Sequence, residues 1–176
     1  MHNGFYNRKE KGEIFFNCMT EESSGKYEDL SLYDFLHGDC PYFAGWLAQK
    51  YNYPMWTITF LYKKSENGYW RKWDNSIIHS FCTTSYKDKI YYIDARGITD
   101  NSLNFISEFL DVIAEIEKQC KEKGYQYKID YKMYNSFDKY LKTKKDFNVK
   151  TFLEAHSLEE KYADIFDFEK FKKAYL

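Results

Sequence analysis

Hydrophobic and polar residues alternate along several short stretches of the chain, a pattern with a period of two that is typical of β-strands. The alternation predicts strands over residues 56–62, 76–85, 89–95 and about 127–133. Asn67-Gly68, between the first two of these strands, is a strong signal for a tight hairpin turn. The short links between the first three strands therefore predict an antiparallel sheet.

Apolar residues at helical spacing predict helices before and after these strands. After Cys40, apolar residues recur at i, i+1, i+4, i+5 and i+8. Pro41 is tolerated only in the first turn of a helix, so it fixes the start of this helix beside Cys40. A long amphipathic helix is predicted over about 102–123, with Gly124 as its stop. Its apolar stripe consists of Leu103, Ile106, Phe109, Leu110, Ile113 and Ile116.

The two ends of the chain have weaker patterns. Residues 1–28 are polar and punctuated by Gly and Ser, which predicts a loosely packed lead-in, and residues 30–36 predict one or two helical turns. The region after the last strand predicts short helices. No repeat or linker interrupts the chain, so we expect one α+β domain over residues 1–176, with a core at about 30–100 and an extension at 101–176.

Composition and charge narrow the classes of function. The chain has 176 residues, which is enough for a sizeable core, and 21% of them are aromatic. Its net charge is −1 with acids and bases interspersed, so nucleic acid is not an expected partner. No apolar run reaches the roughly 18 residues of a membrane span, and no secretory signal is visible. The four cysteines lack a disulfide pattern, which predicts reduced thiols and a cytoplasmic protein.

Three residues follow one another in the order of a cysteine-nucleophile triad. Cys40 starts a helix, and His79 and Asp94 lie in two successive strands. A thiol attacks only as a thiolate, which a helix N-terminus and an imidazole held by a carboxylate can generate at neutral pH. If the two strands form a hairpin centred on Lys87-Asp88, Asp94 faces Phe81 and comes within side-chain reach of His79. Asp94 can then orient the imidazole toward the thiol.

This pattern resembles the transglutaminase-like branch of the papain-fold cysteine enzymes. The resemblance covers about residues 38–97 and is carried by Cys40, Ala44, Leu47, Pro54, His79 and Asp94, with Gly97 after the aspartate. It implies a papain-like core in which a nucleophile helix packs on an antiparallel sheet, with additional C-terminal helices. The implied roles are nucleophile for Cys40, base for His79 and orienter for Asp94. Relatives of this kind include peptidases, deamidases, acyltransferases and inactive binding modules.

The chain departs from that pattern at two points. Ser80 stands where transglutaminases usually have an aromatic residue after the histidine, and Phe81 comes one position later. No Trp precedes Cys40. The triad and the resemblance nevertheless lead us to expect an enzyme that forms a thioester with an amide or acyl carbonyl of a protein or peptide substrate, without a cofactor. The choice between hydrolysis and transfer stays open.

Two other interpretations remain open at this level. The first is a non-catalytic protein-binding module on the same fold. The second is a tetrahedral zinc site made by His37, Cys40, His79 and Cys82, whose two His-x-x-Cys pairs supply four ligands. Residues 79 and 82 of one strand point to opposite faces, which argues against shared coordination. Arg96 could also pair with Asp94, although we expect this flanking strand residue to point to the other face.

Overall fold

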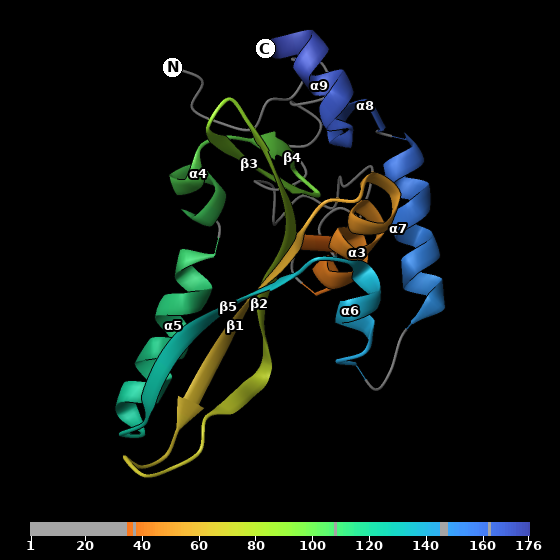
Figure 1. Cartoon of the computed structure of the whole chain (residues 1–176). Helices are drawn as coiled ribbons and strands as arrows, with labels where there is room; N and C mark the ends of the chain where they lie inside the picture. Colours follow the sequence, from red (N-terminus) through yellow and green to blue (C-terminus); the bar gives the residue numbers. More distant parts are fainter. Residues whose placement is uncertain (1–34, 37, 108, 145–147, 162) are drawn as a thin grey trace, which may run out of the picture.

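A five-stranded antiparallel sheet forms the centre of the molecule (Figure 1). The computed structural model describes residues 35–36, 38–107, 109–144, 148–161 and 163–176. The predicted lead-in and most of the predicted turns at 30–36 lie outside these ranges. The strands are β1 (Met55–Lys63), β2 (Arg71–Tyr86), β3 (Lys89–Asp94), β4 (Gly97–Thr99) and β5 (Gln126–Tyr134). Their order in the sheet is β4-β3-β2-β1-β5.

Helices flank this sheet before, within and after the run of strands. They are α3 (Cys40–Tyr51), α4 (Ser102–Ser107), α5 (Leu110–Glu122), α6 (Phe137–Leu141), α7 (Val149–Lys161), α8 (Ala163–Phe166) and α9 (Phe168–Tyr175). The fold is therefore mixed α and β, with an antiparallel sheet and several helices, as the sequence predicted. Within the described ranges, no helix combines the length and apolarity that crossing a membrane requires.

The hairpin of β2 and β3 has the predicted register. Cys82 pairs with Ile93, and Tyr86 pairs with Lys89. The connecting residues Lys87 and Asp88 have φ values of 48° and 62°. Positive φ at both central residues is the geometry of a two-residue turn that matches the twist of the strands. Local turn chemistry therefore fixes which residues of the two strands share a face.

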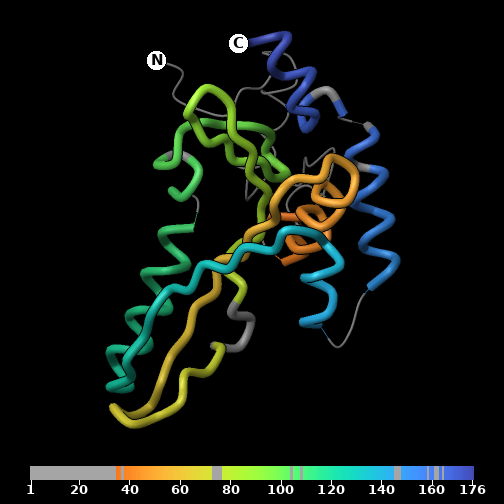
Figure 2. Tube along the Cα trace, viewed as in Figure 1, coloured from red at the N-terminus to blue at the C-terminus, as the bar shows by residue number. Residues whose placement is uncertain are grey.

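The hairpin of β1 and β2 is longer and less regular. β2 begins five residues earlier than predicted, because its ladder with β1 continues to the pair Tyr62 and Arg71. The register shifts twice along this ladder, between Ile58 and Thr59 and again before Leu61. In Figure 2 the outer part of this hairpin extends with β5 and α5 away from α3. The bulges therefore separate an inner half of the ladder, near α3, from an outer half.

Each face of the sheet has its own apolar core. On the side that we call the α3 face, Phe43, Ala44 and Leu47 of α3 pack with Met55, Cys82 and Ile93. On the opposite side, the α5 face, Phe105, Phe109 and Ile113 pack with Ile58, Phe60 and Phe81. Alternation along the strands explains the division, because successive side chains point to opposite faces. Figure 1 shows α3 and the C-terminal helices on one side, and α4 and α5 on the other.

Helix α3 starts where the sequence predicted. Pro41 lies in its first turn, and Asn52 follows its end in the left-handed conformation, with a φ of 58°. Asp39 occupies the N-cap position, but its side chain makes no capping hydrogen bond. At Gly45 an added Cβ would lie 2.2 Å from the ring of Phe137. Glycine at this position therefore lets α6 approach α3 closely.

The predicted long helix is divided into α4 and α5. At the division, the amide of Phe109 donates to the carbonyl of Ile106, 3.0 Å away, which closes a tight turn. The predicted apolar stripe is wrong in part, because Leu103 is 77% exposed and Leu110 is 51% exposed. Phe105, which lay outside the predicted stripe, and Phe109, which belonged to it, are both buried. The break between α4 and α5 places both rings on the sheet.

A buried carboxylate joins α7 to α3. Glu159 accepts hydrogen bonds from Trp46 Nε1 at 3.3 Å, from Lys50 Nζ at 2.6 Å and from the hydroxyl of Tyr51. These bonds hold the pKa of Glu159 below its usual range, although its burial acts in the opposite direction. Three donors on the C-terminal half of α3 therefore compensate the cost of burying this charge.

Candidate active site

His79 and Asp94 are in direct contact, as the hairpin register predicted. Nε2 of His79 lies 2.9 Å from Oδ2 of Asp94. Both side chains are buried, with 0% and 1% of their surfaces exposed. They reach each other diagonally from β2 and β3, on the α5 face. The two strands thus assemble the base and the orienter of the expected triad.

Arg96 binds the same carboxylate. Its backbone amide donates to Oδ1 of Asp94 at 2.8 Å, and its Nη2 donates to Oδ2 at 2.6 Å. Nη2 also donates to the carbonyl of Phe105, and the guanidinium lies 5.0 Å from the centroid of that ring. The expectation that Arg96 points to the other face is wrong. Residues two apart in a strand share a face, so Arg96 lies on the side of Asp94, and the turn before Gly97 brings its backbone amide to the same carboxylate.

Asp94 is ionised in this environment. Burial alone would favour the neutral acid, but the charge of Arg96 and the hydrogen bonds from His79 and Arg96 hold the pKa of Asp94 well below its usual range. A carboxylate between two donors can fix an imidazole in one orientation. It can also stabilise a positive charge that develops on that imidazole.

His79 is neutral in the folded protein. Burial lowers the pKa of its imidazole, and the hydrogen bond and charge of Asp94 oppose this effect only in part. Because Nε2 faces the ionised carboxylate, Nε2 carries the proton and donates it, which leaves a lone pair on Nδ1. Within the described residues Nδ1 has no hydrogen-bond partner by distance and angle, although the backbone of Leu36 lies near the ring and acts to raise its pKa. The ring stacks on Phe109, with centroids 4.2 Å apart and planes inclined by 23°.

Cys40 lies on the other side of β2, at the start of α3. It is 3% exposed, and its sulfur faces both the backbone and the side chain of Ser80, the residue that follows His79. Burial raises the pKa of the Cys40 thiol to about 12, and the charges of Asp94 and Asp39 add to the rise, whereas Ser80 lowers it. The thiol is therefore protonated at neutral pH in this conformation.

Two members of the expected triad are thus in contact, whereas the third faces Ser80, the residue that follows His79. Within the described residues, Nε2 of His79 binds Asp94, and neither Nδ1 nor the hydroxyl of Ser80 has a hydrogen-bond partner by distance and angle. The thiol and the imidazole therefore lie on either side of β2 without a direct contact. For proton transfer, the sulfur and Nδ1 have to come within hydrogen-bond reach.

The alternative zinc site has little support in the described residues. Within the described ranges, no three His, Cys, Asp or Glu side chains are close enough together to hold a metal ion. Cys82 packs on the α3 face, where its Sγ donates to the carbonyl of Ala44 at 3.2 Å. His79 points to the α5 face. His37 lies outside the described residues.

Sequence patterns missed several residues that shape this site. Phe105 and Phe109 pack against the imidazole of His79, and Arg96 binds Asp94 beside it. The predicted apolar stripe contained Phe109 but not Phe105. Ser80 was noted only as a departure from the transglutaminase pattern, although it is the neighbour of the thiol. The only signal for Arg96 was its position two residues after Asp94.

Comparison with known proteins identifies no relative of this chain. No family model, curated protein or solved structure gives a significant match to the chain. The function is therefore inferred from the arrangement of these residues and from the chemistry that it permits.

Proposed function

We propose that this protein is a cysteine enzyme of papain-like architecture that acts on an amide or acyl carbonyl through a thioester. The observation that carries the proposal is the 2.9 Å hydrogen bond between His79 Nε2 and Asp94, which fixes the ring and turns Nδ1 away from the carboxylate. A base oriented in this way, next to a cysteine at a helix start, has the parts of a nucleophile–base–orienter system.

In the proposed reaction, Nδ1 of His79 takes the proton from the Cys40 thiol. The thiolate attacks the carbonyl carbon, and the backbone amide of Cys40 stabilises the negative oxygen, because Pro41 has no N–H and the amides of Tyr42 and Phe43 donate to the carbonyl of Asp39. The imidazolium then gives its proton to the leaving amine, and the bond between carbon and nitrogen breaks to leave a thioester. Water or a second amine attacks the thioester and regenerates the thiol. Asp94 remains ionised throughout and stabilises the imidazolium.

The burial of Cys40 makes the described conformation a resting state in this proposal. A thiol with a pKa of about 12 is not nucleophilic at neutral pH. The start of α3 therefore has to open, so that the sulfur is exposed and reaches Nδ1. A protein or peptide substrate can stabilise this open state through its contacts, whereas a small activated ester reacts with the fraction of molecules that open spontaneously.

The second candidate is a non-catalytic protein-binding module. The observation that favours it is the saturation of the Asp94 carboxylate by Arg96, through the backbone amide and the guanidinium together. With Cys40 buried on the opposite side of β2, the cluster of His79, Asp94 and Arg96 can be a purely structural device that joins β3 to β2.

Acyl transfer from p-nitrophenyl acetate separates the two candidates, because this small activated ester acetylates a functional nucleophile. The enzyme should acquire one acetyl group on Cys40, located by mass spectrometry. A His79→Gln variant should slow this reaction by about 100-fold or more. Cys82, which is equally buried but has no base beside it, is the internal control. Acetylation of Cys40 at the rate of Cys82, or at a rate independent of His79, would support the binding module instead.

A further inference from the structure

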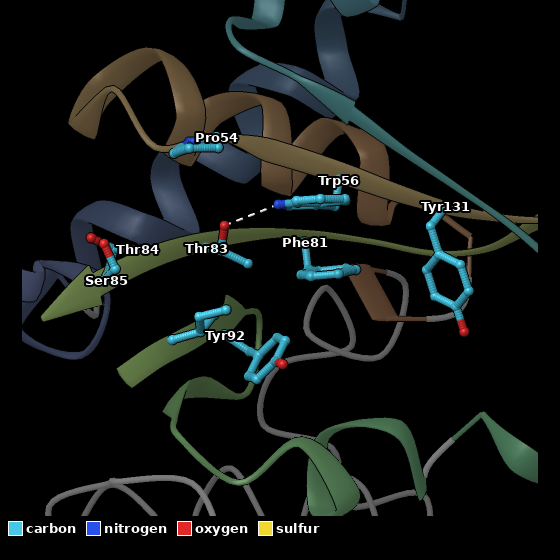
Figure 3. A pocket seen from close by; sticks show the side chains of 9 residues that line it. Pro54, Trp56, Phe81, Thr83, Thr84, Ser85, Tyr92 and Tyr131 are labelled. Carbon is cyan, nitrogen blue, oxygen red and sulfur yellow. Dashed lines mark hydrogen bonds between the residues drawn. The ribbon is translucent and has the colours of Figure 1, made fainter. Parts of the chain in front are cut away.

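A hollow opens on the α5 face of the sheet, separate from Cys40 (Figure 3). Its volume is about 550 Å³, which lies in the range of pockets that hold small molecules. Four of its walls are aromatic, namely Trp56, Phe81, Tyr92 and Tyr131. Each strand from β3 across to β5 contributes one of these rings, so the hollow is built into the sheet rather than into a loop.

The aromatic walls favour a flat occupant. Trp56 and Phe81 are nearly parallel, with an interplanar angle of 11° and centroids 6.5 Å apart. Tyr131 is 57% exposed and leaves a large part of its ring available for contact. Flat rings stack favourably on such walls in offset or edge-to-face geometry, and each such pair contributes beyond its buried area.

The lining of the hollow disfavours a charged occupant. None of its nine lining residues is charged, so an ionic occupant would lose hydration without gaining a counter-charge. Thr83 accepts a hydrogen bond from Trp56 Nε1 at 2.9 Å (Figure 3). This bond uses the only donor of the indole and leaves the hydroxyl proton of Thr83 to donate elsewhere. The hydroxyl of Ser85, farther along the same strand, offers a second donor.

We propose that this hollow binds a neutral, flat aromatic small molecule that carries a hydrogen-bond acceptor. The rings of Trp56 and Tyr131 stack on it above the buried Phe81, and the hydroxyls of Thr83 and Ser85 donate to its acceptor. The inference does not depend on the chemistry of Cys40. The hollow nevertheless adjoins the proposed active site, because Phe81 also stacks near His79, with centroids 6.1 Å apart and planes 9° apart.

Coumarin is a suitable probe, since it is neutral, bicyclic and flat, with a carbonyl acceptor. Titration into the ¹⁵N-labelled full chain should shift the indole N–H signal of Trp56 saturably. A Ser85→Phe variant, which fills the hollow from an exposed strand position, should weaken binding by about tenfold or more. Lys118→Phe adds the same side chain at an exposed position on α5 outside the hollow, and it should leave the affinity unchanged.

Two further ligands test the stated chemistry. Coumarin-3-carboxylate should bind at least about tenfold more weakly than coumarin, because its charge finds no partner in the hollow. N-acetylphenylalaninamide, which presents an aromatic ring on a peptide unit, should also bind more weakly. The proposal is wrong if Trp56 shows no saturable shift, if Ser85→Phe leaves the affinity for coumarin unchanged, or if either comparison ligand binds as tightly as coumarin.

Discussion

The two faces of the sheet differ in kind although they share the same strands. On the α3 face, Cys82 meets the backbone of α3 in an apolar core that the C-terminal helices extend. On the α5 face, His79, Asp94 and Arg96 form a charged cluster under aromatic rings, and a hollow opens beside it. Alternation along β2 supplies both environments. One strand can therefore stabilise the fold with every second residue and supply chemistry with the others.

The largest loss of stability is expected from a substitution that disrupts the charged cluster of the α5 face. Arg96→Met should lower the free energy of unfolding by about 3–5 kcal/mol, because it leaves the buried carboxylate of Asp94 without its cationic partner. Urea unfolding followed by circular dichroism measures the change. Adding Asp94→Asn to this variant should recover part of the loss, since the amide carries no charge. A loss below about 1 kcal/mol would show that the cluster is hydrated, contrary to its buried position.

A smaller effect is expected from overfilling the α3 face. Gly45→Val should lower the free energy of unfolding by about 1–3 kcal/mol, because its Cβ would meet the ring of Phe137 at 2.2 Å. The same urea experiment measures this loss. Phe137→Ala removes the obstructing ring, so the double variant should be more stable than the sum of the two single losses predicts. Strict additivity would mean that the contact between α3 and α6 adjusts without strain.

The dependence of stability on pH should distinguish the two faces of the sheet. Each titrating group can change the free energy of unfolding by up to about 1.4 kcal/mol per pH unit. The pKa of His79 is lowered from 6.5, so the unfolded chain binds its proton first and stability falls as the pH decreases below 6.5. The pKa of Cys40 is raised from 9.0 to about 12, so stability falls as the pH rises above 9.0. The acid limb near pH 6 therefore reports the α5 face, whereas the alkaline limb combines Cys40 with other thiols whose pKa is raised by burial, Cys82 on the α3 face and Cys120 on the α5 face.

Variants assign the two limbs to their residues. His79→Gln should flatten the acid limb near pH 6, where Asp94 contributes little because its lowered pKa acts only below its unfolded value of 3.8. Cys40→Ala should reduce the alkaline slope but not abolish it, because burial also raises the pKa of Cys82. Thermal melts across the pH range measure both effects. An acid limb that survives in His79→Gln would place the responsible group elsewhere.

Local signals explain how much of the fold and the site could be predicted. The turn at Lys87-Asp88 sets the register of β2 and β3 within a few residues, and the contact between His79 and Asp94 follows from that register. The start of α3 was predictable for the same reason, since Pro41 restricts its own backbone. Patterns with a short range were therefore sufficient for the elements and for two members of the site.

Features that depend on packing between distant segments could not be predicted. In the divided helix, Phe105 and Phe109 cover His79 and Arg96, while Leu103 and Leu110 are exposed. The spacing of apolar residues in the sequence does not indicate which of these side chains is buried. The pKa of Cys40 depends in the same way on its burial, which its position at a helix start does not reveal. Sequence reasoning predicted an activated thiolate there, whereas the described conformation holds a protonated thiol.

The shifts in register between β1 and β2 have a consequence for how this hairpin can change in evolution. Inside the first bulge, Ile58 pairs with His79, and the pairs continue evenly to Met55 and Cys82. Outside it, the ladder has already absorbed extra residues on β2 before Leu61 meets Lys72. An insertion or deletion in the outer half can be taken up at these irregular positions. The outer end of the hairpin of β1 and β2 can therefore lengthen or shorten between lineages while His79 still points to the α5 face.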